Sequence, residues 1–162
     1  MPTFLVVTLE TLPGWARELL VAERVARLAY VDDHDRPRVL PVTFAVEGGA
    51  VWSAIDEKPK RTPEPARLRH LRRRPEAALL VDVYDDDWSR LAWVQLLGAV
   101  QIVDVRSHAR DAVAALAALA GKYPQYAERT PPGPLLRLTV ERALQWRAAG
   151  SPRRDHSLQD PG

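Results

Sequence analysis

The chain of 162 residues has no cysteine, only three lysines and no long apolar run. Without cysteine there can be no disulfide framework, no thiolate zinc or iron–sulfur site and no thiol nucleophile. No segment approaches the about 18 consecutive apolar residues of a membrane-spanning helix, and the first residues carry no basic leader. We therefore expect a cytoplasmic protein without a membrane partner, whose redox chemistry, if any, comes from a bound cofactor.

Familiar catalytic motifs are also missing. The sequence has no Gly-x-Ser-x-Gly elbow, no dinucleotide-binding glycine pattern and no phosphate-binding P-loop. The four histidines show no spacing suited to a shared metal ion: His34, His70, His108 and His156. We expect no metal site, and we assign no residue as a catalytic acid, base or nucleophile.

The composition that is present is that of one globular domain. Hydrophobic residues make up 46%, charged residues 27%, and the formal net charge is +2. We expect residues 1–13 to be an N-terminal extension and residues 14–148 to be the folded domain. Residues 149–162 contain too few apolar groups to offset the entropy of ordering, so we expect a disordered tail.

The periodicity predicts short strands joined in hairpins, with a few helices. The expected helices cover residues 13–23, 65–74 and 107–121, and the expected strands cover residues 25–31, 38–46, 50–55, 77–84, 91–105 and a segment around 136–141. The Gly48-Gly49 pair predicts a tight hairpin turn. This order favours a small, mainly β, antiparallel barrel with attached helices over a doubly wound sheet.

Two of these segments carry more detailed expectations. Apolar residues occupy both strand phases of 91–105, which predicts cover on both faces, and Gly98 in its middle predicts a bulge. In the helix 107–121, Ser107 is the expected N-cap and Gly121 the expected end. Its apolar stripe is expected at four positions: Val113, Leu116, Ala117 and Ala120.

A basic segment, Lys58 to Thr62, follows the strand that ends near Ser53, and the expected helix 65–74 continues its positive charge. Between Lys58 and Arg74 there are eight cationic residues and a single acidic one, Glu64. Cations at a strand end, with hydroxyl groups beside them and a helix start beyond, can hold a phosphate or a carboxylate chain. For Arg69 to Arg74 a solvated helix face is the simpler interpretation.

The strand 38–46 has two unequal faces. The large side chains Leu40, Val42, Phe44 and Val46 alternate with the smaller Val39, Pro41, Thr43 and Ala45. The large face suits the core, and the small face leaves room for a planar ring. A plain outer face beneath a neighbouring element is the alternative.

Several of these motifs together resemble one known family. They are Asp35-Arg36-Pro37-Arg38, Pro41-Val42-Thr43-Phe44, Asp56-Glu57-Lys58-Pro59-Lys60-Arg61-Thr62 and Tyr84-Asp85-Asp86-Asp87-Trp88-Ser89-Arg90-Leu91. The chain, from about Leu20 to Trp146, resembles the pyridoxamine-phosphate-oxidase-like, FMN-binding split barrels. Among these it is most similar to the actinobacterial branch that uses the deazaflavin coenzyme F420. It departs from the family pattern at Tyr30 and at Pro63-Glu64-Pro65.

The resemblance implies a homodimer of antiparallel split β-barrels with two cofactor sites at the subunit interface. Carried over by position, the residues expected to hold the cofactor phosphate or its acidic tail are Lys58, Lys60, Arg61 and Thr62, with Ser53 at the strand end. Pro41, Val42 and Thr43 are expected to flank the ring. Trp88, Ser89 and Arg90 are expected to approach from a loop near the interface.

The implied function is an F420-dependent oxidoreductase that transfers a hydride between the deazaflavin and a small conjugated substrate. The cofactor would supply the chemistry, which agrees with the missing catalytic motifs. The alternatives are an FMN-dependent oxidoreductase and a non-catalytic barrel that binds flavin or haem. A nucleic-acid partner is not expected, because the arginine stripe lacks interleaved aromatic residues.

Overall fold

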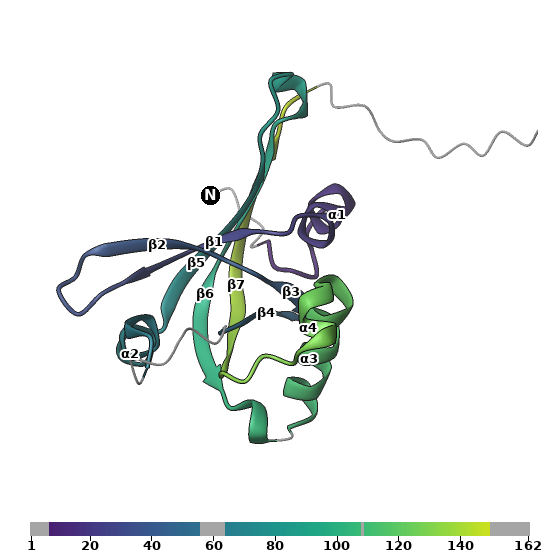
Figure 1. Cartoon of the computed structure of the whole chain (residues 1–162). Helices are drawn as coiled ribbons and strands as arrows, with labels where there is room; N and C mark the ends of the chain where they lie inside the picture. The colour runs from purple at the N-terminus through teal and green to yellow at the C-terminus, as the bar shows by residue number, and fades with distance from the viewer. Residues whose placement is uncertain (1–6, 56–63, 108, 150–162) are drawn as a thin grey trace, which may run out of the picture.

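The computed structural model describes residues 7–55, 64–107 and 109–149. Its strands form one antiparallel sheet in the order β2-β1-β5-β6-β7-β4-β3. The strands are β1 (Ala26–Val31), β2 (Pro37–Val42), β3 (Ala45–Glu47), β4 (Ala50–Ala54), β5 (Glu76–Val83), β6 (Ala92–Val103) and β7 (Leu135–Arg147). The helices are α1 (Gly14–Ala22), α2 (Ala66–Arg73), α3 (Arg110–Lys122) and α4 (Pro124–Glu128), with short 3-10 turns η1 (Trp88–Arg90) and η2 (Val105–Ser107). The expected mainly β, antiparallel fold with helices is confirmed (Figure 1).

The sheet curls almost into a barrel because its two edge strands follow one another in the chain. Only Thr43 and Phe44 separate β2 from β3. Three steps between consecutive Cα atoms span at most about 11 Å, so the edges must lie close together. No hydrogen-bonded ladder joins β2 to β3 in the described part of the chain. The sheet is therefore not closed, and the expected single strand over 38–46 is in fact two strands.

The break at Thr43-Phe44 also changes which side chains reach the core. Phe44 is fully buried, whereas Val46, expected on the same core face, is 38% exposed. Ala45 is buried in its place. The expectation for Val46 was wrong because β2 pairs with β1 while β3 turns to pair with β4.

Glycines form the predicted turn and the predicted bulge. Gly48 and Gly49 have φ angles of 58° and 73° and join β3 to β4, as a tight hairpin turn requires. The β6–β7 register shifts between Leu97 and Gly98. A Cβ on Gly98 would lie 1.9 Å from the carbonyl oxygen of Thr139, so only glycine allows β7 to approach so closely.

The barrel core is completed by the N-terminal segment and α1. Leu9 and Leu12, from the expected extension, are buried with Leu20 of α1 against the strand side chains. The amide of Ala143 in β7 donates to the carbonyl of Val7 at 2.6 Å. Residues 1–6 and 150–162, and with them most of the expected tail, lie outside the described residues.

The helix α3 covers the outer face of β4. Its start and its buried residues differ from those expected from the sequence. It begins at Arg110, and Ser107 lies in η2 with its hydroxyl donating to the Asp104 carbonyl at 2.7 Å, so Ser107 is not the N-cap. The buried side chains are Ala112, Ala115 and Leu119, while Val113 is 52% exposed. The helix also continues one residue past Gly121.

Beyond the barrel, β5, β6 and β7 continue as an arm that ends at η1 (Figure 1). β1 pairs with β5 only as far as Leu80, whereas the β5–β6 ladder continues to Val83 and Ala92. Along β6, Val94, Leu96 and Val100 are buried, and the opposite phase is only partly covered within one chain. No helix in the described ranges is long and apolar enough to cross a membrane.

Candidate functional site

The hydroxyl of Ser53 is a buried polar group without a partner. Ser53 lies in β4, where every residue is buried, and is itself 7% exposed. Its Oγ has no hydrogen-bond partner among the described residues. The β3–β4 ladder ends at the pair Ala45 and Trp52. Phe44, on the side toward β2, and Ser53 of β4 are the residues directly beyond this last pair, and we call this place the divide between β2 and β4. Because a buried hydroxyl is costly when unpaired, this group marks a position that a ligand can satisfy.

The structure places Pro41, Val42 and Thr43 at the end of β2, on the same divide between β2 and β4. Pro41 is exposed and Val42 and Thr43 are partly buried. A proline in an edge strand directs its missing N–H to the free side, so the free edge of β2 at Pro41 offers a carbonyl and no donor. The Thr43 hydroxyl is already engaged, 2.9 Å from the hydroxyl of Tyr126. Ser53 in β4 and Thr43 at the end of β2 thus both lie within two residues of the last β3–β4 pair, Ala45 and Trp52, and their shared role in a cofactor site stays a prediction.

Lys58, Lys60, Arg61 and Thr62 lie outside the described residues. The chain leaves the described part at Ile55, whose amide donates to the Pro134 carbonyl at 3.3 Å, and returns at Glu64. Gly133 lies against Ile55 so closely that a Cβ there would come within 2.7 Å of the Ile55 carbonyl oxygen. Ile55, the last described residue before the basic segment, is thus held against the 131–134 loop.

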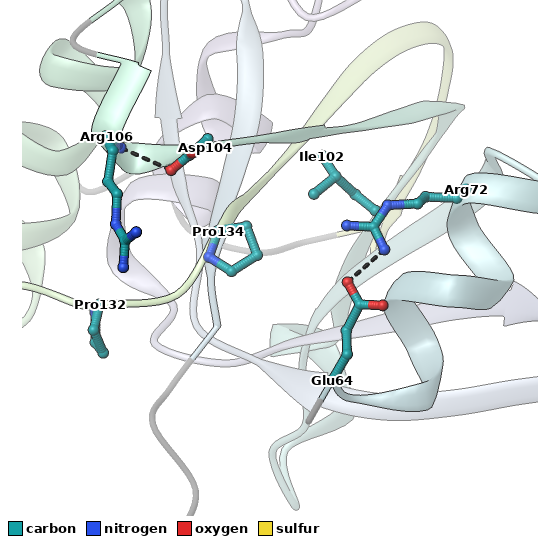
Figure 2. Close-up of a pocket in the computed structure, with 7 residues that line it drawn as sticks. All are labelled: Glu64, Arg72, Ile102, Asp104, Arg106, Pro132 and Pro134. Atoms are coloured by element: carbon teal, nitrogen blue, oxygen red, sulfur yellow. Dashed lines mark hydrogen bonds and ion pairs between the residues drawn. The ribbon is translucent and has the colours of Figure 1, made fainter. Parts of the chain in front are cut away.

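A cavity of about 400 Å³ lies beside this point. It is lined by Glu64, Arg72, Ile102, Asp104, Arg106, Pro132 and Pro134. Figure 2 shows Arg72 and Glu64 facing one another on one side and Arg106 on the other, with Pro134 between them. Arg72 and Glu64 form an ion pair. Two arginines and two carboxylates balance, so the described lining of this cavity carries no net formal charge.

Most of the arginine stripe on α2 is used to attach the helix to the β1–β2 turn. Asp33 lies 3.2 Å from Arg69, 3.0 Å from the His70 ring and 3.5 Å from Arg73. Arg74 pairs with Asp35 at 2.7 Å. The interpretation of Arg69 to Arg74 as a structural face therefore gains support.

Arg67 is the exception on α2. Its Nε is buried and has no hydrogen-bond partner among the described residues. It lies in the first turn of α2, directly after the basic segment, and the helix has no side-chain N-cap. Arg67 was not singled out from the sequence, because it could not be told apart from its neighbours until their partners were known.

Lowered pKa values in the β1–β2 turn support the attachment of α2 to this turn. Hydrogen bonding to His70, above all, lowers the pKa of Asp33, although partial burial acts in the opposite direction. Burial alone would raise the pKa of Asp32, but hydrogen bonds from the His34 and Arg36 amides and the Arg36 side chain lower it to about 2. Both carboxylates are therefore charged at neutral pH.

Trp88, Ser89 and Arg90 form η1 at the tip of the arm, away from Ser53 and the end of β2 (Figure 1). Trp88 is 70% exposed. The Ser89 hydroxyl donates to Asp87 at 2.7 Å, and this bond is the largest cause of a lowered pKa at Asp87. Arg90 pairs with Asp85 at 3.3 Å. Within one chain, the structure does not bring these three residues to the described site residues Ser53, Pro41, Val42 and Thr43.

Tyr123 and Tyr126, from the end of α3 and from α4, were not predicted. The Tyr123 hydroxyl accepts from the Phe44 amide at 2.9 Å and lies 3.0 Å from the Phe44 carbonyl oxygen, across the link between β2 and β3. Burial raises the pKa of this hydroxyl. A signal for these residues was present in the sequence: Pro124 indicates a helix start, and the tyrosines Tyr123 and Tyr126 stand on either side of it.

Comparison with known families gives one match over most of the chain. Residues 12–147 match the family described as Pyridoxamine 5'-phosphate oxidase. Among curated proteins, no sequence matches.

Solved structures share the fold at low sequence identity. A conserved hypothetical protein, Rv2991 from Mycobacterium tuberculosis, is 17% identical with a TM-score of 0.67, covering 88% of this chain and 86% of that chain. A heme binding protein from Mycobacterium smegmatis is 21% identical with a TM-score of 0.64, covering 86% and 56%. A FAD-binding protein from Mesorhizobium loti is 19% identical with a TM-score of 0.61, covering 83% and 94%.

Proposed function

The chain belongs to the pyridoxamine 5'-phosphate oxidase family, and from that premise we propose that it is a flavin-type oxidoreductase that uses the deazaflavin coenzyme F420. FMN is the alternative cofactor. The bound cofactor would accept or deliver a hydride, while the protein would supply orientation, exclusion of water and charge. The substrate class we propose is a small conjugated molecule.

The observation that carries this proposal is the unpartnered hydroxyl of Ser53. It is buried at the divide between β2 and β4 and lies five residues before Lys58, the first cation of the basic segment. A buried hydroxyl next to cations fits a phosphate oxygen, which accepts hydrogen bonds from both. The buried Nε of Arg67 is a second unpaired donor, at the other end of the same segment.

The proposed roles follow from this placement. Ser53 and Arg67, with Lys58, Lys60, Arg61 and Thr62 between them, would hold the phosphate. Pro41, Val42 and Thr43 would flank the ring, where the Pro41 carbonyl can accept from a ring N–H.

The choice of F420 over FMN depends on the size of the positive charge. Both cofactors carry a phosphate, and F420 carries in addition an acidic polyglutamyl tail. Asp33, Asp35 and Glu64 compensate the other α2 arginines, while the Arg67 Nε has no hydrogen-bond partner among the described residues. By sequence, Lys58, Lys60 and Arg61 add three more cations to this region. This is more positive charge than one phosphate neutralises. It favours F420 over FMN, because the polyglutamyl tail of F420 adds further carboxylates.

We also propose that the working unit is a homodimer. The arm carries Tyr84 and Trp88 with about 70% of each exposed, and the acidic run Asp85 to Asp87 beside them. A second copy offers a fitting surface, because the basic segment has the opposite charge. In such a dimer the arm residues Trp88, Ser89 and Arg90 of one chain would reach the cofactor site of the other.

The direct test is a titration of the purified protein with F420, FMN and the phosphate-free deazaflavin chromophore, followed by fluorescence at several salt concentrations. We expect F420 to bind most tightly, with an affinity that falls as salt rises, and the phosphate-free chromophore to bind weakly. Tighter binding of FMN would assign the flavin alternative. Binding of haem alone would contradict the oxidoreductase proposal.

Charge reversal tests the basic segment itself. Replacing Lys58, Lys60 and Arg61 with glutamate is expected to lower the F420 affinity at least ~100-fold, because three attractions become repulsions. The matched control replaces three exposed arginines elsewhere, Arg17, Arg110 and Arg142, and is expected to change the affinity less than ~3-fold. An unchanged affinity in the folded 58/60/61 variant would remove the phosphate-site assignment.

A further inference from the structure

Lys122, the last residue of α3, has unusual surroundings for a lysine. Its Nζ lies 3.6 Å from the centre of the Phe44 ring and 5.7 Å from that of the Tyr123 ring. It donates to the Leu20 carbonyl at the end of α1 at 3.0 Å. The amine is thus held in a fixed position, partly buried between two aromatic rings and a helix terminus.

The charges around Lys122 are not arranged as in an ordinary ion pair. Arg24, a second cation, donates to the Lys122 carbonyl and lies 5.9 Å from the Tyr123 ring. Within the described ranges no carboxylate lies at ion-pair distance from Lys122 or Arg24, and Glu23 is the acidic group that acts on the amine from further away. From β3 the adjoining residues are the uncharged Ala45 and Val46.

Desolvation, followed by repulsion from Arg24, lowers the pKa of Lys122 to about 8, while Glu23 acts in the opposite direction. A lysine of this pKa is neutral in about one molecule in ten at pH 7, roughly 300 times more often than a lysine of pKa 10.5. Burial beside apolar groups and a neighbouring cation are the two conditions that make a lysine nucleophilic.

A cavity of about 450 Å³ lies beside the amine, between α1, β3 and α3. Its lining is mainly apolar: Leu20, Val21, Ala22, Ala45, Val46, Ala118 and Gly121, with Arg24 and Lys122. The cavity shares no lining residue with the cavity at Arg72 and Arg106. It has room for a small apolar molecule next to the Lys122 nitrogen.

We propose that Lys122 is a nucleophilic amine that condenses with small apolar aldehydes entering this cavity. The nitrogen lone pair attacks the carbonyl carbon, a carbon–nitrogen double bond forms, and the carbonyl oxygen leaves as water with both amine protons. The resulting imine can still carry a proton on nitrogen. It therefore keeps the attraction to the Phe44 ring and to the Leu20 carbonyl that holds the amine.

The test uses the full chain, propionaldehyde as the probe and cyanoborohydride to reduce the imine to a stable secondary amine. Peptide mass spectrometry then compares the three lysines of the chain, Lys58, Lys60 and Lys122. We expect Lys122 to be labelled at least ~10-fold faster than the other two at pH 7, with a rate that rises to a plateau above about pH 8. In guanidinium the three lysines are expected to react at similar rates.

Two variants separate the chemistry from the fold. Arg24→Met removes the neighbouring cation and is expected to slow labelling of Lys122 at pH 7 by about 2- to 5-fold. Arg17→Met, an exposed position on α1, is the matched control and should leave the rate unchanged. Equal labelling of the three lysines in the folded wild-type protein, or a Lys122 rate that still rises steeply above pH 10, would overturn the proposal.

Discussion

At the scale of the single residue, a change at Ser53 is expected to affect the stability of the cofactor-free protein and its cofactor affinity in opposite directions. Its hydroxyl is buried and unpaired, so Ser53→Ala is expected to stabilise the cofactor-free protein by about 1 kcal/mol. The same change is expected to weaken F420 binding by about 10-fold, since a hydrogen bond to the phosphate is lost. Thermal unfolding and fluorescence titration measure the two effects.

The control for this prediction is Ser107→Ala. The Ser107 hydroxyl donates to the Asp104 carbonyl at 2.7 Å, so its removal is expected to lower stability and leave cofactor affinity unchanged. If Ser53→Ala instead lowered the stability of the cofactor-free protein without affecting affinity, its hydroxyl would serve the fold alone.

Residue-level features were predicted well from the sequence where the backbone itself imposes them. Gly48-Gly49 and Gly98 were identified because positive φ angles and close strand approach require glycine whatever lies around them. Ser107 was assigned wrongly because a serine caps a helix only if the following residues start it. Here Ser107 ends the 3-10 turn η2, and α3 begins only at Arg110.

At the scale of the element, one carboxylate, Asp33, contacts three side chains of α2. Asp33 faces Arg69, His70 and Arg73, and the helix directly follows the basic segment. Asp33→Asn is expected to lower the melting temperature at pH 7 and to weaken cofactor binding, because the phosphate-binding residues next to α2 lose their fixed support. Differential scanning calorimetry over a pH range tests the first part.

The sign of the pH dependence follows from the lowered pKa of Asp33. A carboxylate with a lower pKa in the folded state stabilises the protein above the unfolded-state value of 3.8, and this stabilisation disappears as the pH falls through the folded-state value. The melting temperatures of wild type and Asp33→Asn are thus expected to differ at pH 7 and to converge below pH 3.8. A constant difference across this range would show that the charge of Asp33 is not what anchors α2.

Some helices and strands follow from the local sequence, and others depend on pairing with distant strands. The three expected helices and most of the expected strands appear within a few residues, because apolar periodicity decides them locally, whereas the last strand, expected around 136–141, continues to Arg147. The separation of 38–46 into β2 and β3 was not predictable, since it depends on which distant strands, β1 and β4, pair with each half. The pairing of Arg69, Arg73 and Arg74 with Asp33 and Asp35 likewise depends on tertiary contact, so the sequence could not show that these arginines attach α2 to the β1–β2 turn.

At the scale of the whole molecule, the arm carries three exposed aromatic side chains. The strands β5 to β7 project beyond the barrel (Figure 1), and Tyr84, Trp88 and Trp146 are 71%, 70% and 46% exposed. Isolated apolar residues at a surface are ordinary, but three aromatic residues on one projection are typical of an interface. The homodimer that we propose would bury them.

The proposed homodimer can be tested by removing these three aromatic side chains. Replacing Tyr84, Trp88 and Trp146 with serine is expected to convert a dimer into a monomer in sedimentation velocity at micromolar concentration, because buried interface aromatics contribute about 2 kcal/mol or more each. The control, Val21→Ser with Val113→Ser, changes exposed apolar residues on α1 and α3 and should leave the dimer intact. Since Trp88 would reach the cofactor of the partner, the monomeric variant should also bind F420 more weakly. A wild-type chain that sediments as a monomer, or a triple variant that stays dimeric, would contradict an interface at the arm and leave Ser53 and the basic segment to form the site within a single chain.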